Sequence, residues 1–167
     1  KPFAVAKFDS QVLLFGVLPM SHKILLIISQ VIGYCSSKFI GIKVVSEMGS
    51  AKRGAAILVC IGVAEFALLL FGIVPAPYDA LCMALNGLPL GMVWGLVFGF
   101  LEGRKLSELL GAGLSASYIV ASGAVKSIGK QVLDLGVPEK WMPFFTGLLF
   151  VIPLLIAVWM LSQLPPP

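Results

Sequence analysis

Long runs of apolar residues, separated by short polar or charged segments, dominate the pattern along this chain. About 20 consecutive apolar residues are enough for an α-helix to cross the hydrocarbon core of a bilayer. The pattern predicts a partial helix and an outer loop in residues 1–19, followed by spanning helices at 21–45, 54–74, 80–101, 107–129 and 141–162. Ser21 and Asp79 stand where they could cap the first and third of these spans.

Composition places the chain in the membrane class. Hydrophobic residues make up 59% of it and charged residues only 12%, whereas soluble domains average about 25% charged residues. The mean hydropathy is +1.02. The expected fold is therefore an all-α, polytopic transmembrane bundle whose surroundings are lipid. The net charge of +4 is small, so we expect no nucleic-acid partner and interpret the positive charge as loops facing anionic lipid.

Basic residues give a weak indication of orientation. Two short segments, 43–53 and 102–106, carry Lys43, Lys52, Arg53, Arg104 and Lys105. Because short cytoplasmic loops are enriched in Lys and Arg, we expect both segments on the cytoplasmic side. The chain begins at Lys1 rather than Met, which we interpret as a fragment of a larger membrane protein.

Glycine occupies every fourth position along the predicted third span, at Gly87, Gly91, Gly95 and Gly99. Each glycine inside a helix costs about 1 kcal/mol relative to alanine, but in lipid small residues let helices approach closely. The stripe predicts a groove that one or two neighbouring helices fill. It serves either packing alone or a smooth interface along which helices move.

Three ionisable groups, Glu65, Lys38 and Lys126, are expected at membrane depth, where a charge costs about 2.5–3.5 kcal/mol. Glu65 is near the centre of the second span. It either couples transport to a proton or cation, or it pairs with Lys38, Lys126 or another helix group. Lys38 either faces a solute or extends to the membrane surface.

Two polar stripes accompany these charges. Gln30, Tyr34 and Lys38 repeat every four residues on one face of the first span, and Ser122 and Lys126 share a face of the fourth. Converging stripes would form a basic cavity for an anionic solute, as in membrane transporters with midplane sites. Asn86 either joins this cavity or bonds a neighbouring helix.

Other chemistry is not indicated. Cys35, Cys60 and Cys82 lie in separate apolar runs, and no Cys/His cluster or phosphate-binding glycine loop occurs, so no metal or cofactor is predicted. His22 is expected at the membrane interface. No serine has an evident His and acid partner in the sequence, so we predict no enzyme.

Several segments resemble the N-terminal half of a major facilitator superfamily transporter. They are "SQVIGYCSSKFIGIKVVSEM", "NGLPLGMVWGLVFGFLEGR" and the loop "KVVSEMGSAKR", in which Glu47, Lys52 and Arg53 match the acidic and basic positions of the superfamily's gating loop. The resemblance is to a bacterial branch, and Lys1-Pro2-Phe3 is similar to the first-helix signature of organic-phosphate antiporters. It implies half of the superfamily fold, with the five spans as helices two to six, a missing C-terminal half as partner, and a place in the bacterial inner membrane.

Together these observations predict secondary active transport, by alternating access, of a small anionic solute, with phosphorylated compounds implied by the resemblance. The alternative is a non-transporting membrane module, such as an assembly factor or a sensor, built on the same bundle.

Overall fold

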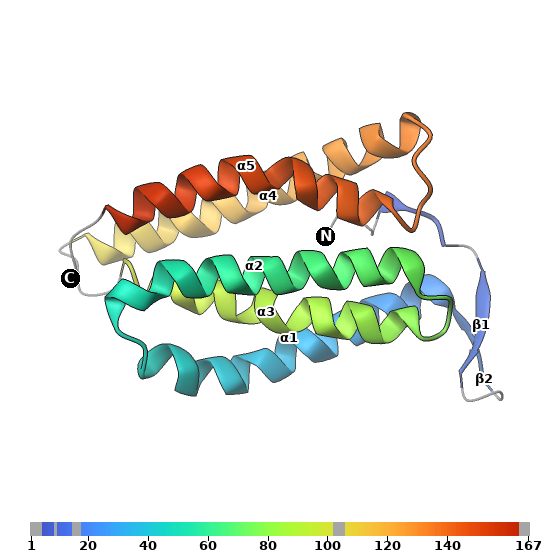
Figure 1. Ribbon diagram of the computed structural model, residues 1–167, viewed down its shortest axis with the longest axis horizontal. Helices are drawn as coiled ribbons and strands as arrows, with labels where there is room; N and C mark the ends of the chain where they lie inside the picture. The colour runs from blue at the N-terminus through green and yellow to red at the C-terminus, as the bar shows by residue number, and fades with distance from the viewer. Residues whose placement is uncertain (1–4, 9, 15–17, 102–105, 164–167) are drawn as a thin grey trace.

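The computed structural model describes residues 5–8, 10–14, 18–101 and 106–163. It is an all-α bundle with a short hairpin at one end (Figure 1). The helices are α1 (His22–Ser46), α2 (Ser50–Ile73), α3 (Asp79–Phe98), α4 (Ser107–Asp134) and α5 (Met142–Ser162). All five are long and apolar enough to cross a membrane. The predicted fold class, a polytopic helical membrane bundle, is confirmed.

Helix bounds differ from the predicted spans where polar residues continue a helix beyond the apolar run. α2 begins at Ser50 rather than 54. α4 continues to Asp134 rather than 129 because Lys130 and Gln131 favour a helix without being apolar. It ends just before Gly136, whose φ of 87° suits glycine. α3 ends at Phe98, three residues before the predicted bound.

The N-terminal segment differs more. Strands β1 (Gln11–Leu14) and β2 (Leu18–Ser21) form an antiparallel hairpin within the predicted outer loop. The predicted partial helix lies partly outside the described residues, and residues 5–8 contain no α-helix. Their backbone N–H groups are used elsewhere, because those of Lys7 and Phe8 each donate to the Glu139 carboxylate at 3.1 Å.

Neither Ser21 nor Asp79 caps its helix through a side-chain hydrogen bond, contrary to the prediction from the sequence. Ser21 occupies the N-cap position of α1, but its side chain makes no capping hydrogen bond. Asp79 is the first residue of α3, and its carboxylate faces His22 rather than its own helix end. Both helices therefore begin at the same end of the bundle, and there their first residues contact each other.

The bundle has two parts. α1, α2 and α3 lie together, and α4 and α5 form a second layer in which α5 lies next to α2 (Figure 1). Successive helices alternate in direction, so α1 and α3 run parallel. Of the described residues of α4, only Gly129 and Val132 are buried. We call the end at His22 and Asp79 the hairpin end and the opposite end the loop end.

Glycines bring α1 and α3 into backbone contact. A methyl group on Gly87 would collide with the Gln30 carbonyl oxygen, and one on Gly91 would lie 2.7 Å from the Tyr34 carbonyl oxygen. From the α1 side, Gly33 packs against the backbone of Ala84 in the same way. This is the close approach that small residues permit in hydrocarbon.

The rest of the glycine stripe meets other neighbours. A methyl group on Gly95 would be in ordinary contact with Val45, and one on Gly99 would lie 3.0 Å from the Arg53 guanidinium of α2. The stripe therefore passes from the α1 backbone to side chains of α1 and then to α2.

Two hydrophobic clusters fill the interior. The cluster near the hairpin end includes Leu26, Phe71, Met83 and Met142. The cluster near the loop end includes Ile57, Leu96, Phe100 and Val158. Polar side chains occupy the helix segments between these clusters: Gln30, Glu65 and Asn86.

Candidate functional site

Lys38 is exposed, and its ammonium lies beside two aromatic rings, one from α1 and one from α3. Its ammonium is 4.9 Å from the ring centre of Tyr34 and 5.3 Å from that of Trp94. Tyr34 is one turn before Lys38 on α1, and the parallel packing of α1 and α3 brings in Trp94. Among the described residues, Lys38 forms no ion pair and no hydrogen bond. The rings attract the cation but leave its three N–H donors available.

The aromatic group extends toward α4. Trp94 stacks on Phe98, with ring centres 5.2 Å apart and planes at 7°. A methyl group on Gly111, near the start of α4, would lie 3.5 Å from the Phe98 ring. Further along α4, Tyr118 is exposed. The residues around Lys38 thus come from α1 and α3, and α4 lies opposite them.

Ser122 and Lys126 follow Tyr118 at intervals of four residues, so the three side chains share one face of α4. Ser122 and Lys126 are exposed. α4 runs opposite to α1 (Figure 1), so Ser122 and Lys126 follow Tyr118 toward the hairpin end, whereas Lys38 follows Tyr34 toward the loop end. No contact joins Lys38 to Lys126 among the described residues.

Gln30 and Asn86 connect three helices. Gln30 Nε2 donates to Asn86 Oδ1 at 2.7 Å, and Asn86 Nδ2 donates to the Ala64 carbonyl at 2.9 Å. Both side chains are 3% exposed. The geometry matches the interhelical bond that the sequence left open for Asn86. Contact of either residue with a solute stays a prediction.

Glu65 has no partner among the described residues. Its carboxylate lies against Gly147 of α5, and its Oε1 atom is buried without a hydrogen bond. No ion pair with Lys38 or Lys126 forms. The proposed pairing with these lysines is therefore absent from this structure.

The three predicted gating-loop residues, Glu47, Lys52 and Arg53, lie in different surroundings. Glu47 and Lys52 are exposed at the loop end. The Arg53 Nη1 atom donates to the Gly99 carbonyl oxygen, while its Nε atom is buried without a partner. Arg53 thereby connects the start of α2 to the end of α3. Arg104 and Lys105 lie outside the described residues.

The sequence did not predict the polar row at the hairpin end. Ser10 Oγ is 3.3 Å from His22 Nδ1, and His22 Nε2 is 2.8 Å from Asp79 Oδ2. The expectation that no serine has a His and acid partner is wrong, because folding brings together residues up to 69 positions apart in sequence. In serine hydrolases Nε2 faces the serine and Nδ1 the acid, so the two nitrogens are exchanged here.

Lys140 completes this row from the connection between α4 and α5. Its Nζ atom is 3.8 Å from Asp79 Oδ2 and donates to the Val74 carbonyl at 2.9 Å. His22 and Asp79 are 3% and 0% exposed, so both side chains are buried within the protein at the start of their helices. The row ties α1, α3 and the α4–α5 connection together at one end of the bundle.

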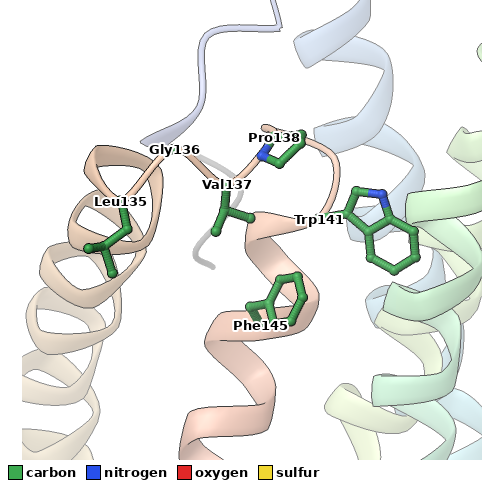
Figure 2. Close-up of a pocket in the computed structure, with 6 residues that line it drawn as sticks. All are labelled: Leu135, Gly136, Val137, Pro138, Trp141 and Phe145. Carbon is green, nitrogen blue, oxygen red and sulfur yellow. The ribbon is translucent and has the colours of Figure 1, made fainter.

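Two hollows lie at this end. One, of about 560 Å³, is lined by Phe8, Ser10, His22, Gly72, Ala76, Pro138, Glu139, Lys140 and Trp141. The other, of about 450 Å³, is apolar and lies where α4 turns into α5 (Figure 2). Trp141 lines both, and its ring packs against Gly72 of α2. Neither hollow contains a site residue predicted from the sequence.

These features define a multi-pass α-helical membrane protein with unpaired polar and charged groups between its helices. The chain belongs to the family DUF5690, a family of unknown function whose sequence profile matches residues 2–167. No curated protein and no solved structure matches the chain.

Proposed function

We propose that this protein is part of a secondary transporter of the bacterial inner membrane, carrying a small anionic solute. Lys38 is the group that binds the anion. The observation that carries the proposal is the Lys38 ammonium, held over Tyr34 and Trp94 without an acidic partner among the described residues. An unpaired cation in a spanning helix is costly, and an anionic solute lowers that cost.

The surroundings of Lys38 support reversible binding. The aromatic rings position the ammonium without neutralising it, so its N–H groups remain free for carboxylate or phosphate oxygens. Lys38 is 16 residues from the start of α1, or about 24 Å along the helix axis. The site therefore lies in the loop-end half of α1, which the basic loops assign to the cytoplasmic side.

The proposal also includes a second polar region on α4 and a C-terminal half of the transporter. Lys126 and Ser122, which are exposed on one face of α4, supply this second polar region. A C-terminal half completes the transporter, and the two halves alternate access to the solute. The hydrogen bonds at the hairpin end support this, because they hold α1, α3 and the α4–α5 connection together at the end opposite the Lys38 site.

Thermal unfolding of the full-length protein in detergent tests anion binding. Inorganic phosphate, glycerol phosphate and succinate are the probes, and a ligand at 100 times its Kd stabilises the native state by about 2.7 kcal/mol. We expect Lys38→Ala to abolish the stabilisation and Lys38→Arg to retain part of it. Lys43→Ala is the matched control, because Lys43 is exposed near the end of the same helix.

Two results would contradict the proposal. One is that none of the three probes raises the unfolding temperature. The other is that Lys38→Ala responds to the probes as the unaltered protein does. Counterflow of labelled phosphate or succinate into vesicles containing the full-length protein then separates transport from binding alone, which is what the sensor or assembly-factor alternative predicts.

A further inference from the structure

Glu65 is half-buried, and its carboxylate lies between α2 and α5 with the Oε1 atom buried. Its partner on α5 is Gly147, where a methyl group would lie 2.8 Å from the Glu65 carboxyl carbon. Glycine at this position leaves the space that the carboxylate fills. Glu65 lies between the two hydrophobic clusters, and therefore away from both ends of the bundle.

Nothing described in the structure neutralises this carboxylate. α5 has no titratable side chain between Met142 and Ser162. On α3, the titratable groups are Cys82 and Asp79, and Asp79 is engaged by His22 and Lys140 at the hairpin end. On α2 itself, Arg53 bonds Gly99, while Lys52 is exposed and Cys60 buried.

A second polar atom in the same region is also unsatisfied. Thr146, the neighbour of Gly147, is 1% exposed, and its hydroxyl has no hydrogen-bond partner. Buried polar atoms without partners are rare in folded proteins and call for an explanation. One carboxylate and one hydroxyl are too few oxygens to surround a metal cation, which takes six or more ligands when it is calcium.

We propose that Glu65 is a proton-binding site that controls the contact between α2 and α5. As a neutral acid, Glu65 packs against Gly147 at no charge cost. When it loses its proton, the unpaired carboxylate becomes expensive to keep buried, and α5 separates from α2 at this point. This assignment rests on the proposed transport function in one respect: proton movement through Glu65 would drive solute movement.

The primary test needs no solute. Thermal unfolding of the full-length protein is measured between pH 5 and 9, together with the infrared band of protonated carboxyl groups. The unaltered protein loses stability as the pH rises, because only the protonated form is compatible with the packed contact. Glu65→Gln mimics the protonated, neutral side chain. It is expected to remove the infrared band of the Glu65 carboxyl group and the loss of stability at high pH. Glu108→Gln, at an exposed position on α4, is the matched control and keeps both.

A second variant tests the contact itself. Gly147→Ala places a methyl group where the carboxylate lies and lowers the unfolding temperature. Combining it with Glu65→Ala restores most of that loss, because the small side chain vacates the space. If Gly147→Ala alone fails to fold, the Glu65→Gln pH profile still decides the question. The proposal is overturned if Glu65→Gln keeps the pH dependence, or if Glu65→Ala gives no rescue.

Transport separates this inference from the proposed function. With labelled phosphate, Glu65→Gln is expected to lower accumulation driven by a proton gradient at least tenfold, while counterflow stays within twofold. If the unaltered protein shows no phosphate counterflow, transport of this anion is rejected and the pH profile still tests the proton site. If accumulation in Glu65→Gln is undiminished, coupling through Glu65 is rejected.

Discussion

Gly91 of α3 packs directly against Ser37 of α1. Ser37 is fully buried, and its hydroxyl donates to the Tyr34 carbonyl at 2.8 Å, one turn back along its own helix. The Cβ atom of Ser37 would lie 3.0 Å from a methyl group placed on Gly91. The absence of a side chain at Gly91 and the small, internally bonded side chain at Ser37 together set how closely the two parallel helices approach.

Gly91→Ala is expected to destabilise the protein. The added methyl group meets the Tyr34 carbonyl and Ser37, and overpacking of this kind costs about 1–3 kcal/mol. Thermal unfolding in detergent measures the loss. Gly123→Ala in α4 is the control, because nothing lies within 4 Å of the added atom; it should be neutral or stabilising by up to about 1 kcal/mol. Equal effects at both positions would rule out the packing explanation.

Asn86→Ala is expected to loosen the connection among α1, α2 and α3. It removes both hydrogen bonds of the Asn86 amide and leaves the buried Gln30 amide without its acceptor, at a cost of about 1–3 kcal/mol. Gln131→Ala, at an exposed position near the end of α4, should change the unfolding free energy little. A loss confined to anion binding, with stability unchanged, would instead favour a solute-contacting role for Asn86.

Asp79→Ala is expected to open the hairpin end. Without this carboxylate, the buried His22 ring loses its 2.8 Å bond and Lys140 loses its ionic partner. The expected cost is about 1–3 kcal/mol. Hydrogen exchange should quicken at the His22 amide, which donates to the Ser10 carbonyl. Asp134→Ala, at the exposed end of α4, is the control, and unchanged exchange in Asp79→Ala would show that the hairpin holds without the polar row.

Trp94→Ala is expected to weaken anion binding without removing the cation. The ring holds the Lys38 ammonium in place by an attraction of about 0.5–2 kcal/mol, so the apparent Kd for the bound anion should rise roughly 2- to 30-fold. Trp94→Phe keeps a ring face and should lose less. Trp159→Ala, an exposed tryptophan on α5, controls for general effects. An unchanged Kd in Trp94→Ala would show that the Trp94 ring does not contribute to anion binding.

The spanning helices could be predicted from the sequence because hydropathy reports directly on the surrounding solvent. Each predicted span overlaps a helix. The bounds differ where polar residues extend a helix beyond its apolar run, as at Lys130 and Gln131, and at α3, which ends three residues early at Phe98. The non-helical backbone at Lys7 and Phe8 was missed because both N–H groups donate to Glu139, more than 130 positions away in the sequence. No local pattern shows such partners.

Side-chain partners depend on which helices are neighbours, and hydropathy does not contain that information. From the sequence, Lys38 and Lys126 were the candidate ion-pair partners of Glu65. In the structure, the Glu65 carboxylate packs against Gly147 of α5 and forms no ion pair among the described residues. The His22–Asp79 contact had a usable signal. His22 begins the first predicted span and Asp79 lies at the start of the third, so alternating spans put both at the same end of the bundle. The sequence pattern did not show that α1 and α3 are neighbours.

The division of the bundle into α1–α3 and α4–α5 has a consequence for biosynthesis. The backbone contacts of Gly33, Gly87 and Gly91 and the Gln30–Asn86–Ala64 connection all lie within the first 98 residues. α1, α2 and α3 can therefore assemble before α4 and α5 are synthesised, in keeping with vectorial folding from the N-terminus. Glu139 and Lys140 are synthesised later, and their bonds to Phe8 and Asp79 then attach the α4–α5 pair to residues made before it.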